Sequence, residues 1–425
     1  MTVAATILIL LLALYALLRE VDVRLVLFLA GLALASLAGQ PLVVFDTFLT
    51  EMGNGKTIGP ICSAMGFAYV LRATGCDQAM VRLLLAPTRR IRWLLIPIGC
   101  AVGFVTNIAI TSQTASAAAV GPILVPLMLA AGYSPLVTAA TLVLGCSGGG
   151  SLFNPGDADL VAIQESSQAP MQLVLQSMLA PLLAGFATAV ALFSIGSRGP
   201  TLRTSTVSPT PDEPIAWSKA LLPPLPLSLI FLMLPGVFFS SPPPPFEKGL
   251  PVSHAMIVGT MAVLLVHRRD FSQQVKSFFE GMGYAYVHVI SLIITASCLI
   301  AGMTATGLTG SLVSLVSGTG AVGKVAAGFF PGLLAVISGS GLGPSVAFAK
   351  AVLPPLSVNV PLALDLGTLA AIAGSFGRTM SPVAAVVIFS ASLTGTSNWN
   401  IIKRTAPVLL TSYIVVLLVV LARGN

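Results

Sequence analysis

The sequence contains very little charge. Only 8% of its 425 residues are Asp, Glu, Lys or Arg, whereas 56% are hydrophobic. A soluble domain carries about 25% charged residues, so a chain of this length could not cover a water-facing surface with so few. The scarcity of charge excludes a soluble protein and indicates an all-α polytopic membrane protein.

Residues that bind metals or form disulfides are also scarce. The five cysteines have no C-x-x-C spacing, and the three histidines lie apart from one another. These spacings indicate neither a disulfide framework nor a zinc site. We therefore expect no cofactor.

Apolar runs recur along the whole chain, and a membrane-spanning helix needs about 20 such residues. The runs indicate ten spanning helices and two segments broken by proline and glycine. The predicted spans are 3–18, 25–40, 57–71, 134–163, 171–196, 220–240, 252–267, 284–302, 361–394 and 405–422, and the broken segments are 93–131 and 325–357. The first run lacks the basic start and the cleavage site of a signal peptide, so we interpret it as a retained span.

The basic residues predict the topology. If the N-terminus lies outside and each broken segment is a hairpin that enters and leaves on one side, most of the 21 Lys and Arg residues fall in inside loops. This asymmetry follows the positive-inside rule. It predicts a multi-pass membrane protein with two re-entrant hairpins. An arrangement of twelve spans is the alternative.

The chain also repeats itself weakly at an offset near 232 residues: residues 73–75 match 305–307, and Pro122 matches Pro354. Each half then contains three spans, a hairpin and two more spans, and the halves start from opposite sides. We predict an inverted repeat, as found in many transporters. Its parts are a first repeat at 1–197, a cytoplasmic linker at 198–219 and a second repeat at 220–425.

Four stretches rich in Gly, Ser, Thr and Asn interrupt the apolar runs at corresponding places in the two halves. They are residues 106–114, 145–157, 338–345 and 374–382. Unpaired backbone groups in hydrocarbon cost several kcal/mol each, so such breaks are tolerated where they line an enclosed, wet site. We predict a substrate or ion site at these breaks. Close helix packing through small residues is the alternative.

Arg378 is the most distinctive residue of the breaks. An intramembrane arginine is costly and by default marks a functional site, and its planar guanidinium can bind a carboxylate through two hydrogen bonds. The alternative is a structural ion pair with Asp157 or Asp159. Asp157 and Asp159 could carry a coupling proton or help to bind a cation, and a helix-capping role is the alternative for Asp157. Lys350 could extend from the second hairpin to the membrane interface.

Two short motifs resemble enzyme signatures. Residues 145–149 fit G-x-S-x-G, which functions on a strand-to-helix turn, and residues 53–57 end like a phosphate-binding loop but follow no strand. Neither context is present, so we expect no enzyme. An intramembrane hydrolase that uses Ser147 is the alternative from another class. Without a nucleotide site, an ion gradient would have to drive transport.

At the four breaks the sequence resembles the DcuC type of anaerobic C4-dicarboxylate carriers, in the ion transporter superfamily of elevator carriers. The matching stretches are TNIAITSQTASAAAVGPIL (106–124), NPG (154–156), SGSGLGP (338–344) and FGRTMSPVAAVV (376–387). The resemblance implies secondary transport of succinate, fumarate or malate by a multi-pass protein of the bacterial inner membrane. It also implies that the hairpins and broken spans move as an elevator against the other helices, and that the elevator scaffold forms a homodimer. Residues 157–159, Asp-Ala-Asp, depart from the Ala-Pro-Glu-like run of the family.

The resemblance places the substrate near the hairpin tips and a sodium site at the paired breaks. The residues predicted to bind substrate are Asn107, Ser112, Gln113, Thr114, Asn154, Ser340, Arg378, Thr379 and Ser381. Those predicted to couple an ion are Asn107, Ser147, Asn154, Ser338 and Ser381, together with Asp157.

The expected function is therefore secondary active transport of a small organic anion, most simply a C4-dicarboxylate, with Na⁺ or H⁺ as the coupling ion. A carrier of citrate or of an amino-acid derivative is one alternative, and a sodium/proton antiporter is another. The expected partners are the substrate and membrane lipid, without nucleic acid.

Overall fold

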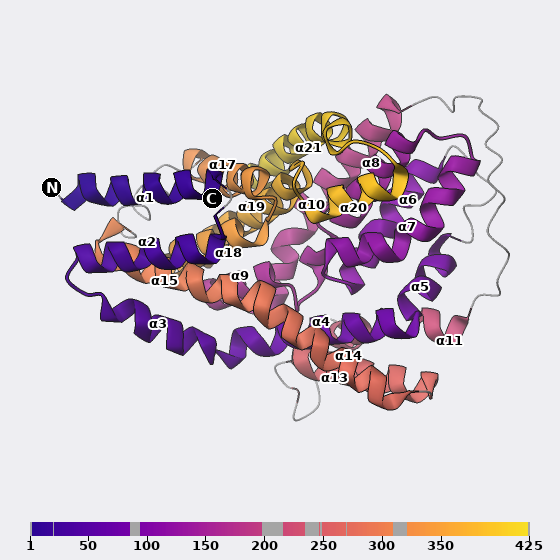
Figure 1. Ribbon diagram of the computed structural model, residues 1–425, viewed down its shortest axis with the longest axis horizontal. Helices are drawn as coiled ribbons and strands as arrows, with labels where there is room; N and C mark the ends of the chain where they lie inside the picture. Colours follow the sequence, from indigo (N-terminus) through magenta and orange to yellow (C-terminus); the bar gives the residue numbers. More distant parts are fainter. Residues whose placement is uncertain are drawn as a thin grey trace.

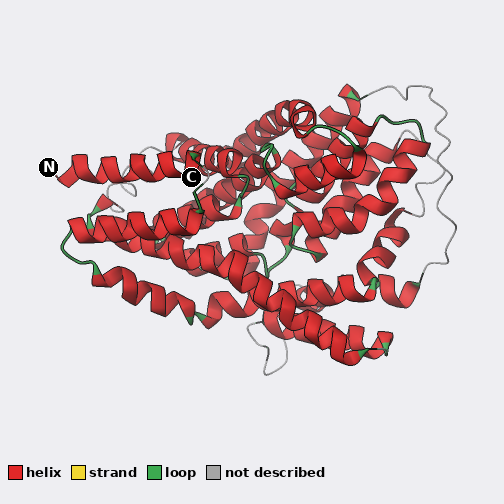
Figure 2. Cartoon of the chain, in the orientation of Figure 1, coloured by secondary structure: helices red, strands yellow, loops and turns green. Residues whose placement is uncertain are grey.

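The computed structural model describes residues 2–19, 21–85, 94–197, 216–233, 246, 249–268, 270–308 and 321–423. Within these ranges the chain consists of helices joined by turns and short loops, and no strand occurs in them (Figure 2). The expected all-helical fold is confirmed. The predicted linker at 198–219 and the end of the predicted span at 220–240 fall largely outside the described residues.

One set of helices, which we call group A, lies along the left and lower edge of Figure 1. It comprises α1 (Thr2–Leu18), α2 (Val23–Leu37), α3 (Leu42–Met52), α4 (Gly55–Thr74), α13 (Val252–His267), α14 (Phe271–Ala285) and α15 (Ser291–Ala305). A π-helical turn, Tyr286–Ile290, joins α14 to α15, so 35 residues form one continuous helix. Helices α2 and α3 pack against α15, and α4 and α13 pack against each other beside α14.

The other set, group B, contains the predicted hairpins and broken spans. It comprises α6 (Leu95–Ala109), α7 (Gln113–Ala130), α8 (Pro135–Ser147), α9 (Ala158–Ser167), α10 (Met171–Gly196), α17 (Ala321–Ser338), α18 (Leu342–Val352), α19 (Val360–Thr379), α20 (Ala385–Thr394) and α21 (Asn398–Leu421). We call α6–α7 hairpin 1 and α17–α18 hairpin 2. The short helices are α5 (Cys76–Leu85), η3 (Gly150–Phe153), α11 (Trp217–Ala220), α12 (Leu225–Leu232) and η5 (Pro354–Leu356).

Helices α8 and α19 form the centre of group B. They are apolar around most of their circumference, a pattern typical of a helix buried on all sides. Every residue from Val137 to Ser147 is buried, and so is most of α19. The outer helices α10 and α21 instead expose large apolar side chains such as Leu179, Leu410 and Ile414. Burial therefore places the two broken spans inside and leaves unbroken helices facing lipid.

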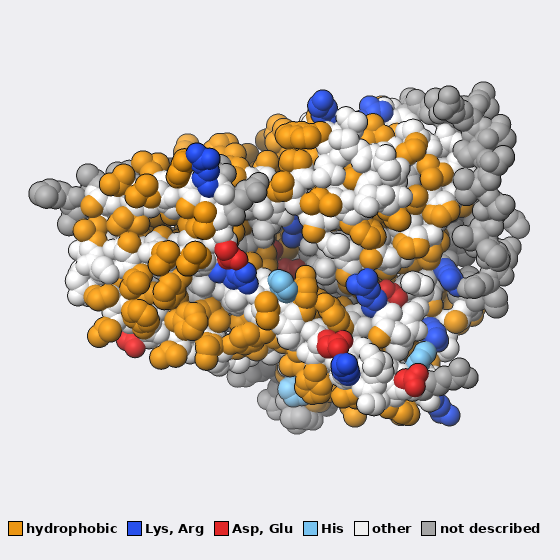
Figure 3. Space-filling view, viewed as in Figure 1, with side chains coloured by type: hydrophobic (Ala, Val, Ile, Leu, Met, Phe, Trp, Pro, Cys, Tyr) orange, Lys and Arg blue, Asp and Glu red, His pale blue; other side chains and the backbone are white. Residues whose placement is uncertain are grey.

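Seven described helical segments have the length and hydropathy to cross a membrane. Hydrophobic side chains cover much of the face shown in Figure 3, and charged side chains are few there. Among the helices that lie outside the predicted spans are α3, α5 and most of α14. The signal for α3 was obscured by charge. The 11 residues of α3 include Asp46 and Glu51, and these two charges made the segment look too polar for a span. Its apolar residues Leu42, Phe45 and Leu49 are exposed in the structure.

Group B contains a buried charge cluster at the start of hairpin 2. The Lys324 Nζ lies 2.8 Å from Asp365 Oδ2, and Arg423 Nη1 lies 3.6 Å from Asp365 Oδ1. Arg423 also donates a hydrogen bond to the Ser177 carbonyl at 2.8 Å. The cluster joins α17, α19 and the end of α21.

The variant Asp365→Asn should destabilise the protein, because it leaves Lys324, only 3% exposed, beside a second cation. Removing one partner of a buried ion pair costs about 3 to 5 kcal/mol. The midpoint temperature of thermal unfolding in detergent should lie clearly below that of the wild type. Glu280→Gln is the control, because the Glu280–Lys276 pair is more than half exposed and contributes little. Equal melting of the two variants would contradict the prediction.

Candidate functional site

The four predicted breaks lie at helix ends and are shorter than the sequence indicates. Residues 110–112 join α6 to α7, and residues 339–341 join α17 to α18. Residues 148–157, with η3 inside them, separate α8 from α9, and residues 380–384 separate α19 from α20. Gly149 and Gly339 have φ values of +94° and +68°, a conformation that favours glycine.

Two asparagines connect hairpin 1 to the break after α8. Asn107 Oδ1 accepts a hydrogen bond from the Ser151 N–H at 2.9 Å, and its Nδ2 donates to the Ile110 carbonyl at 3.0 Å. Asn154 Nδ2 donates to the Ile108 carbonyl at 2.8 Å. Both asparagines were predicted to bind substrate and ion. In this structure their amide groups hold the tip of hairpin 1 against the break.

The C-terminal ends of α8 and α19 meet at Ser147 and Thr379, two residues that are 232 positions apart. Their hydroxyl oxygens lie 2.7 Å from each other, and Thr379 Oγ1 is 2.8 Å from the Ser147 carbonyl oxygen. Ser375 Oγ donates to the same carbonyl at 3.4 Å. Helix C-termini carry partial negative charge, so this meeting point favours a cation over an anion.

Hairpin 2 contacts both broken spans. The Ser345 hydroxyl donates a hydrogen bond to the Asp159 carboxylate, which links α18 to α9. A Cβ added at Gly341 would lie 2.4 Å from the Gly374 carbonyl oxygen, so the start of α18 and α19 touch through their backbones. Asp157 accepts a hydrogen bond from the Asp159 N–H at 2.9 Å and caps α9. The helix-capping role that we considered for Asp157 is present.

Arg378 lies in the last turn of α19 and has few partners. Its Nη2 donates a long hydrogen bond of 3.5 Å to Ser375 Oγ, and its buried Nε has no hydrogen-bond partner among the described residues. Asp159 and Asp157 both act on the guanidinium electrostatically. Arg378 thus lies under the influence of two carboxylates, while its Nε–H has no acceptor in the described part of the chain.

Two further polar atoms at the breaks, Thr106 Oγ1 and Ser381 Oγ, are buried and have no hydrogen-bond partner within the described ranges of the chain. A buried polar group without a partner costs free energy, and such groups in a native structure call for an explanation such as a ligand. Ser381 was among the predicted residues. Asp159 was considered for a coupling proton or a cation. Thr106 and Ser345 lie within the predicted breaks but were not named as site residues.

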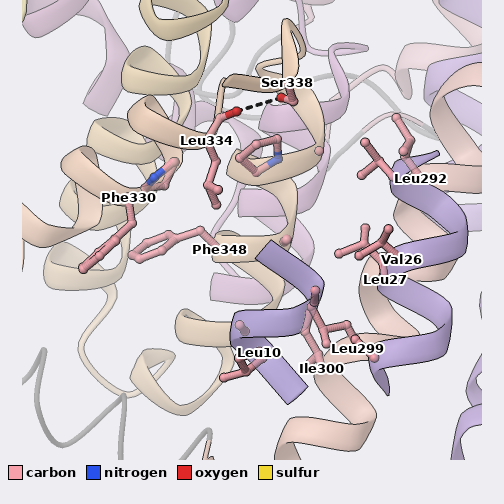
Figure 4. A pocket seen from close by; sticks show the side chains of 18 of the residues that line it. Leu10, Val26, Leu27, Leu292, Leu299, Ile300, Phe330, Leu334, Ser338 and Phe348 are labelled. Carbon is pink, nitrogen blue, oxygen red and sulfur yellow. Dashed lines mark hydrogen bonds between the residues drawn. The ribbon is translucent and has the colours of Figure 1, made fainter. Parts of the chain in front are cut away.

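The remaining predicted residues lie at the hairpin tips. Ser112, Gln113 and Thr114 are half-buried at the start of α7, where Ser112 Oγ accepts from the Ala115 N–H at 3.4 Å. In hairpin 2, Ser338 and Ser340 are also half-buried. The Ser338 hydroxyl donates to the Leu334 carbonyl at 2.8 Å (Figure 4).

A cavity of about 490 Å³ separates hairpin 2 from group A (Figure 4). On one side it is lined by α1, α2 and α15, with Leu27 and Ile300 among the residues, and on the other by α17 and α18, with Phe330 and Phe348. Of its lining side chains only Ser338 and Ser340 carry a hydroxyl, and the others are apolar. The cavity therefore offers no charged group to an anion.

The sequence profile of the C4-dicarboxylate anaerobic carrier family, DcuC, matches residues 50–194 and 219–424. A relative from Vibrio cholerae, named a probable anaerobic C4-dicarboxylate transporter DcuC, is 25% identical over 383 residues, which are 84% of this chain and 79% of the relative. An uncharacterized transporter of Haemophilus influenzae is 35% identical over 188 residues, 44% of this chain and 67% of the relative.

Two solved structures share the fold. The YdaH transporter of Alcanivorax borkumensis aligns with a TM-score of 0.63 at 16% identity and covers 89% of this chain and 87% of its own. MtrF of Neisseria gonorrhoeae, from a class of antimetabolite efflux pumps, aligns with a TM-score of 0.62 at 13% identity. The alignment covers 90% of this chain and 84% of MtrF. At these identities the likeness concerns the fold alone.

The matched profile and relatives are those of transporters and not of enzymes. Ser147, the nucleophile of the alternative hydrolase, shares a hydrogen bond with Thr379. The profile match together with the apolar helices confirms the predicted multi-pass protein of the bacterial inner membrane. Since the profile spans most of the sequence, the chain belongs to the C4-dicarboxylate anaerobic carrier family, DcuC.

Proposed function

We propose that the protein is a secondary active transporter of C4-dicarboxylates such as succinate, fumarate and malate, and that it binds them at the four helix breaks. The observation that carries this proposal is Arg378, a partly accessible arginine with an unpartnered Nε between two broken spans. A guanidinium in this state can donate two parallel hydrogen bonds to one carboxylate of the substrate.

The second carboxylate of the substrate needs other donors. The breaks supply the unpartnered hydroxyls of Thr106 and Ser381. The tip residues Gln113, Thr114 and Ser340, all half-buried, are further candidates on the two hairpins. A short diacid could thus contact hairpin 1, hairpin 2 and α19 at the same time.

The proposal is tested by uptake of radiolabelled succinate into proteoliposomes under imposed Na⁺ and pH gradients. Unlabelled fumarate and malate should compete strongly, whereas citrate and aspartate should compete weakly. Liposomes without protein are the control. Stronger competition by citrate or by an amino-acid derivative would favour those substrates. Proton movement that depends on Na⁺ and needs no organic acid would favour an antiporter.

We also propose that a cation accompanies the substrate. When ionised, Asp157 and Asp159 outnumber the single positive charge of Arg378, so a dianion would enter a site that is already negative. A Na⁺ or H⁺ at the carboxylates would offset this repulsion. Ser147 lies where two helix C-termini meet, and Asn107, Asn154, Ser338 and Ser381 are the other proposed sources of oxygen ligands.

Asp159→Asn should weaken the coupling to the cation, because the substitution removes one negative charge and keeps the hydrogen-bonding shape. We expect the stimulation of succinate uptake by the cation gradient to fall at least severalfold. The matched control is Asp46→Asn, at an exposed position of α3. Undiminished stimulation in Asp159→Asn would contradict the assignment.

For the mechanism we propose an elevator, in which group B moves against group A around a pair of inverted repeats at 1–197 and 220–425. Ser147 and Thr379 support this proposal, because residues one repeat offset apart are in contact at the centre of group B. The equivalent order of a hairpin and a broken span in each half also supports it.

A further inference from the structure

A set of polar residues joins group A to group B at the junction between α3 and α4. It consists of Glu51, Asn54 and Thr57 at the junction, Glu165 on α9 and Lys350 on α18. We call these five residues the boundary network. None of them was assigned to the substrate or ion site, and their spacing along the chain does not reveal their contact.

On the side of hairpin 2, the network is an ion pair. Lys350 Nζ lies 2.9 Å from Glu51 Oε2 and donates to Ser297 Oγ of α15 at 3.0 Å. The side chains of Lys350 and Glu51 are 9% and 19% exposed. Charges this deeply buried are stable only with a partner, so hairpin 2 is tied to group A at this point.

On the side of α9, the network is a pair of hydrogen bonds to a second carboxylate. Asn54 Nδ2 donates to Glu165 Oε1 at 2.6 Å, and Thr57 Oγ1 donates to Glu165 Oε2 at 2.7 Å. Asn54 Nδ2 also lies 3.4 Å from Glu51 Oε2. The amide group of Asn54 therefore bridges both carboxylates. The α3–α4 junction thus contacts group B at α9 and at hairpin 2.

The motif that resembles a phosphate-binding loop, residues 53–57, builds this junction. The chain leaves α3 at Gly53, and Asn54 caps α4 by accepting a hydrogen bond from the Lys56 N–H at 3.2 Å. Tyr286, in the π-helical turn, donates its hydroxyl to the Met52 carbonyl at 3.0 Å. The junction between α3 and α4 is thus in contact with the π-helical turn between α14 and α15.

The surface of hairpin 2 beside the boundary network is apolar. Beside it, the apolar cavity separates hairpin 2 from α1 and α2. Apolar surfaces exert no directional restraint and can slide over one another in lipid, whereas a buried ion pair has one favoured geometry. A displacement of group B therefore has to break the polar contacts of Lys350 and Glu165, in addition to apolar packing such as that of Gly156 against Ala64.

We propose that the boundary network latches group B to group A in the conformation described, and that each transport cycle opens and re-forms it. The five residues are positioning residues, because they act on the two groups and do not touch the proposed substrate site. This inference rests on the relative motion in the proposed function.

The test is hydrogen–deuterium exchange in lipid nanodiscs on the double variant Glu51→Gln with Lys350→Met, which removes the ion pair without leaving a lone charge. We expect exchange at 42–57 and 342–352 to become about tenfold faster, as for a segment that opens more often. The initial rate of succinate uptake should rise at the same time. The charge-reversed variant, Glu51→Lys with Lys350→Glu, should restore slow exchange, whereas Glu51→Lys alone should not.

The matched control is the double variant Lys324→Met with Asp365→Asn, which removes a buried ion pair inside group B. It should leave exchange at 42–57 unchanged. Unchanged exchange at both segments in the first double variant, or no recovery on charge reversal, would overturn the latch. If exchange responds as expected but no dicarboxylate is transported, the latch stands and the proposed substrate is wrong.

Discussion

Replacing Arg378 with alanine is expected to abolish most succinate uptake, with an apparent affinity weaker than that of the wild type by a factor of at least about 100. A hydrogen bond to a charged group contributes about 1.5 to 3 kcal/mol, and two such bonds to one carboxylate would be lost. Arg378→Lys keeps the charge but loses the planar pair of donors, so it should recover only part of the affinity. Uptake kinetics over a range of succinate concentrations measure both effects.

The control for Arg378 is Arg24→Ala. Arg24 is partly exposed at the start of α2, where it pairs with Asp22, and is far along the chain from the breaks. We expect uptake like that of the wild type. Thermal unfolding of each variant separates loss of binding from loss of folding. A folded Arg378→Ala protein with unaltered uptake would remove Arg378 from the substrate site.

Gly374→Leu is the second substitution expected to have a large effect. A Cβ at Gly374 would lie 2.9 Å from the Gly341 carbonyl oxygen and 3.2 Å from Ser345 Cβ. A leucine side chain must therefore push the tip of hairpin 2 away from α19. The displacement would pull Ser345 from Asp159 and move Arg378 relative to the tip, so uptake should fall at least about tenfold. Overpacking of this kind also costs about 1 to 3 kcal/mol in stability.

Gly283→Leu provides the comparison, since nothing lies within 4 Å of a Cβ added there. Gly283 is also a helical glycine, so the two variants differ in the space around the new side chain. Uptake and thermal unfolding should remain close to the wild type in Gly283→Leu. Normal uptake in Gly374→Leu would show that the close approach of hairpin 2 and α19 is not required for transport.

The four breaks illustrate what local sequence can predict. Gly149 and Gly339 interrupt helices because glycine alone adopts their backbone conformation at no cost, and that preference is visible in the sequence. The extent of each break was overestimated, because residues such as Asn107 and Ser375 are polar and yet remain helical. Their side chains bond to other elements, and a helix tolerates them for that reason.

Contacts between distant residues could not be predicted in the same way. We considered that Lys350 could extend to the membrane interface, but its partner is Glu51, 299 residues away in the chain. The helix α3 that carries Glu51 lies outside the predicted spans, so no helix face was available on which to place the carboxylate. Glu165 is likewise bound by Asn54, 111 residues away.

Composition and local pattern alone determined that this chain spans a membrane, that it is helical, and that its helices break at four places. These properties depend on the hydropathy and backbone preferences of neighbouring residues, which the sequence states directly. Tertiary structure alone decided which polar groups are free. Asn107 and Asn154 turned out to be bonded within the protein, whereas Thr106, Arg378 and Ser381 keep unpartnered atoms. Hydrogen-bond partners are assigned by distances across the fold, and those distances exist only once the helices have packed.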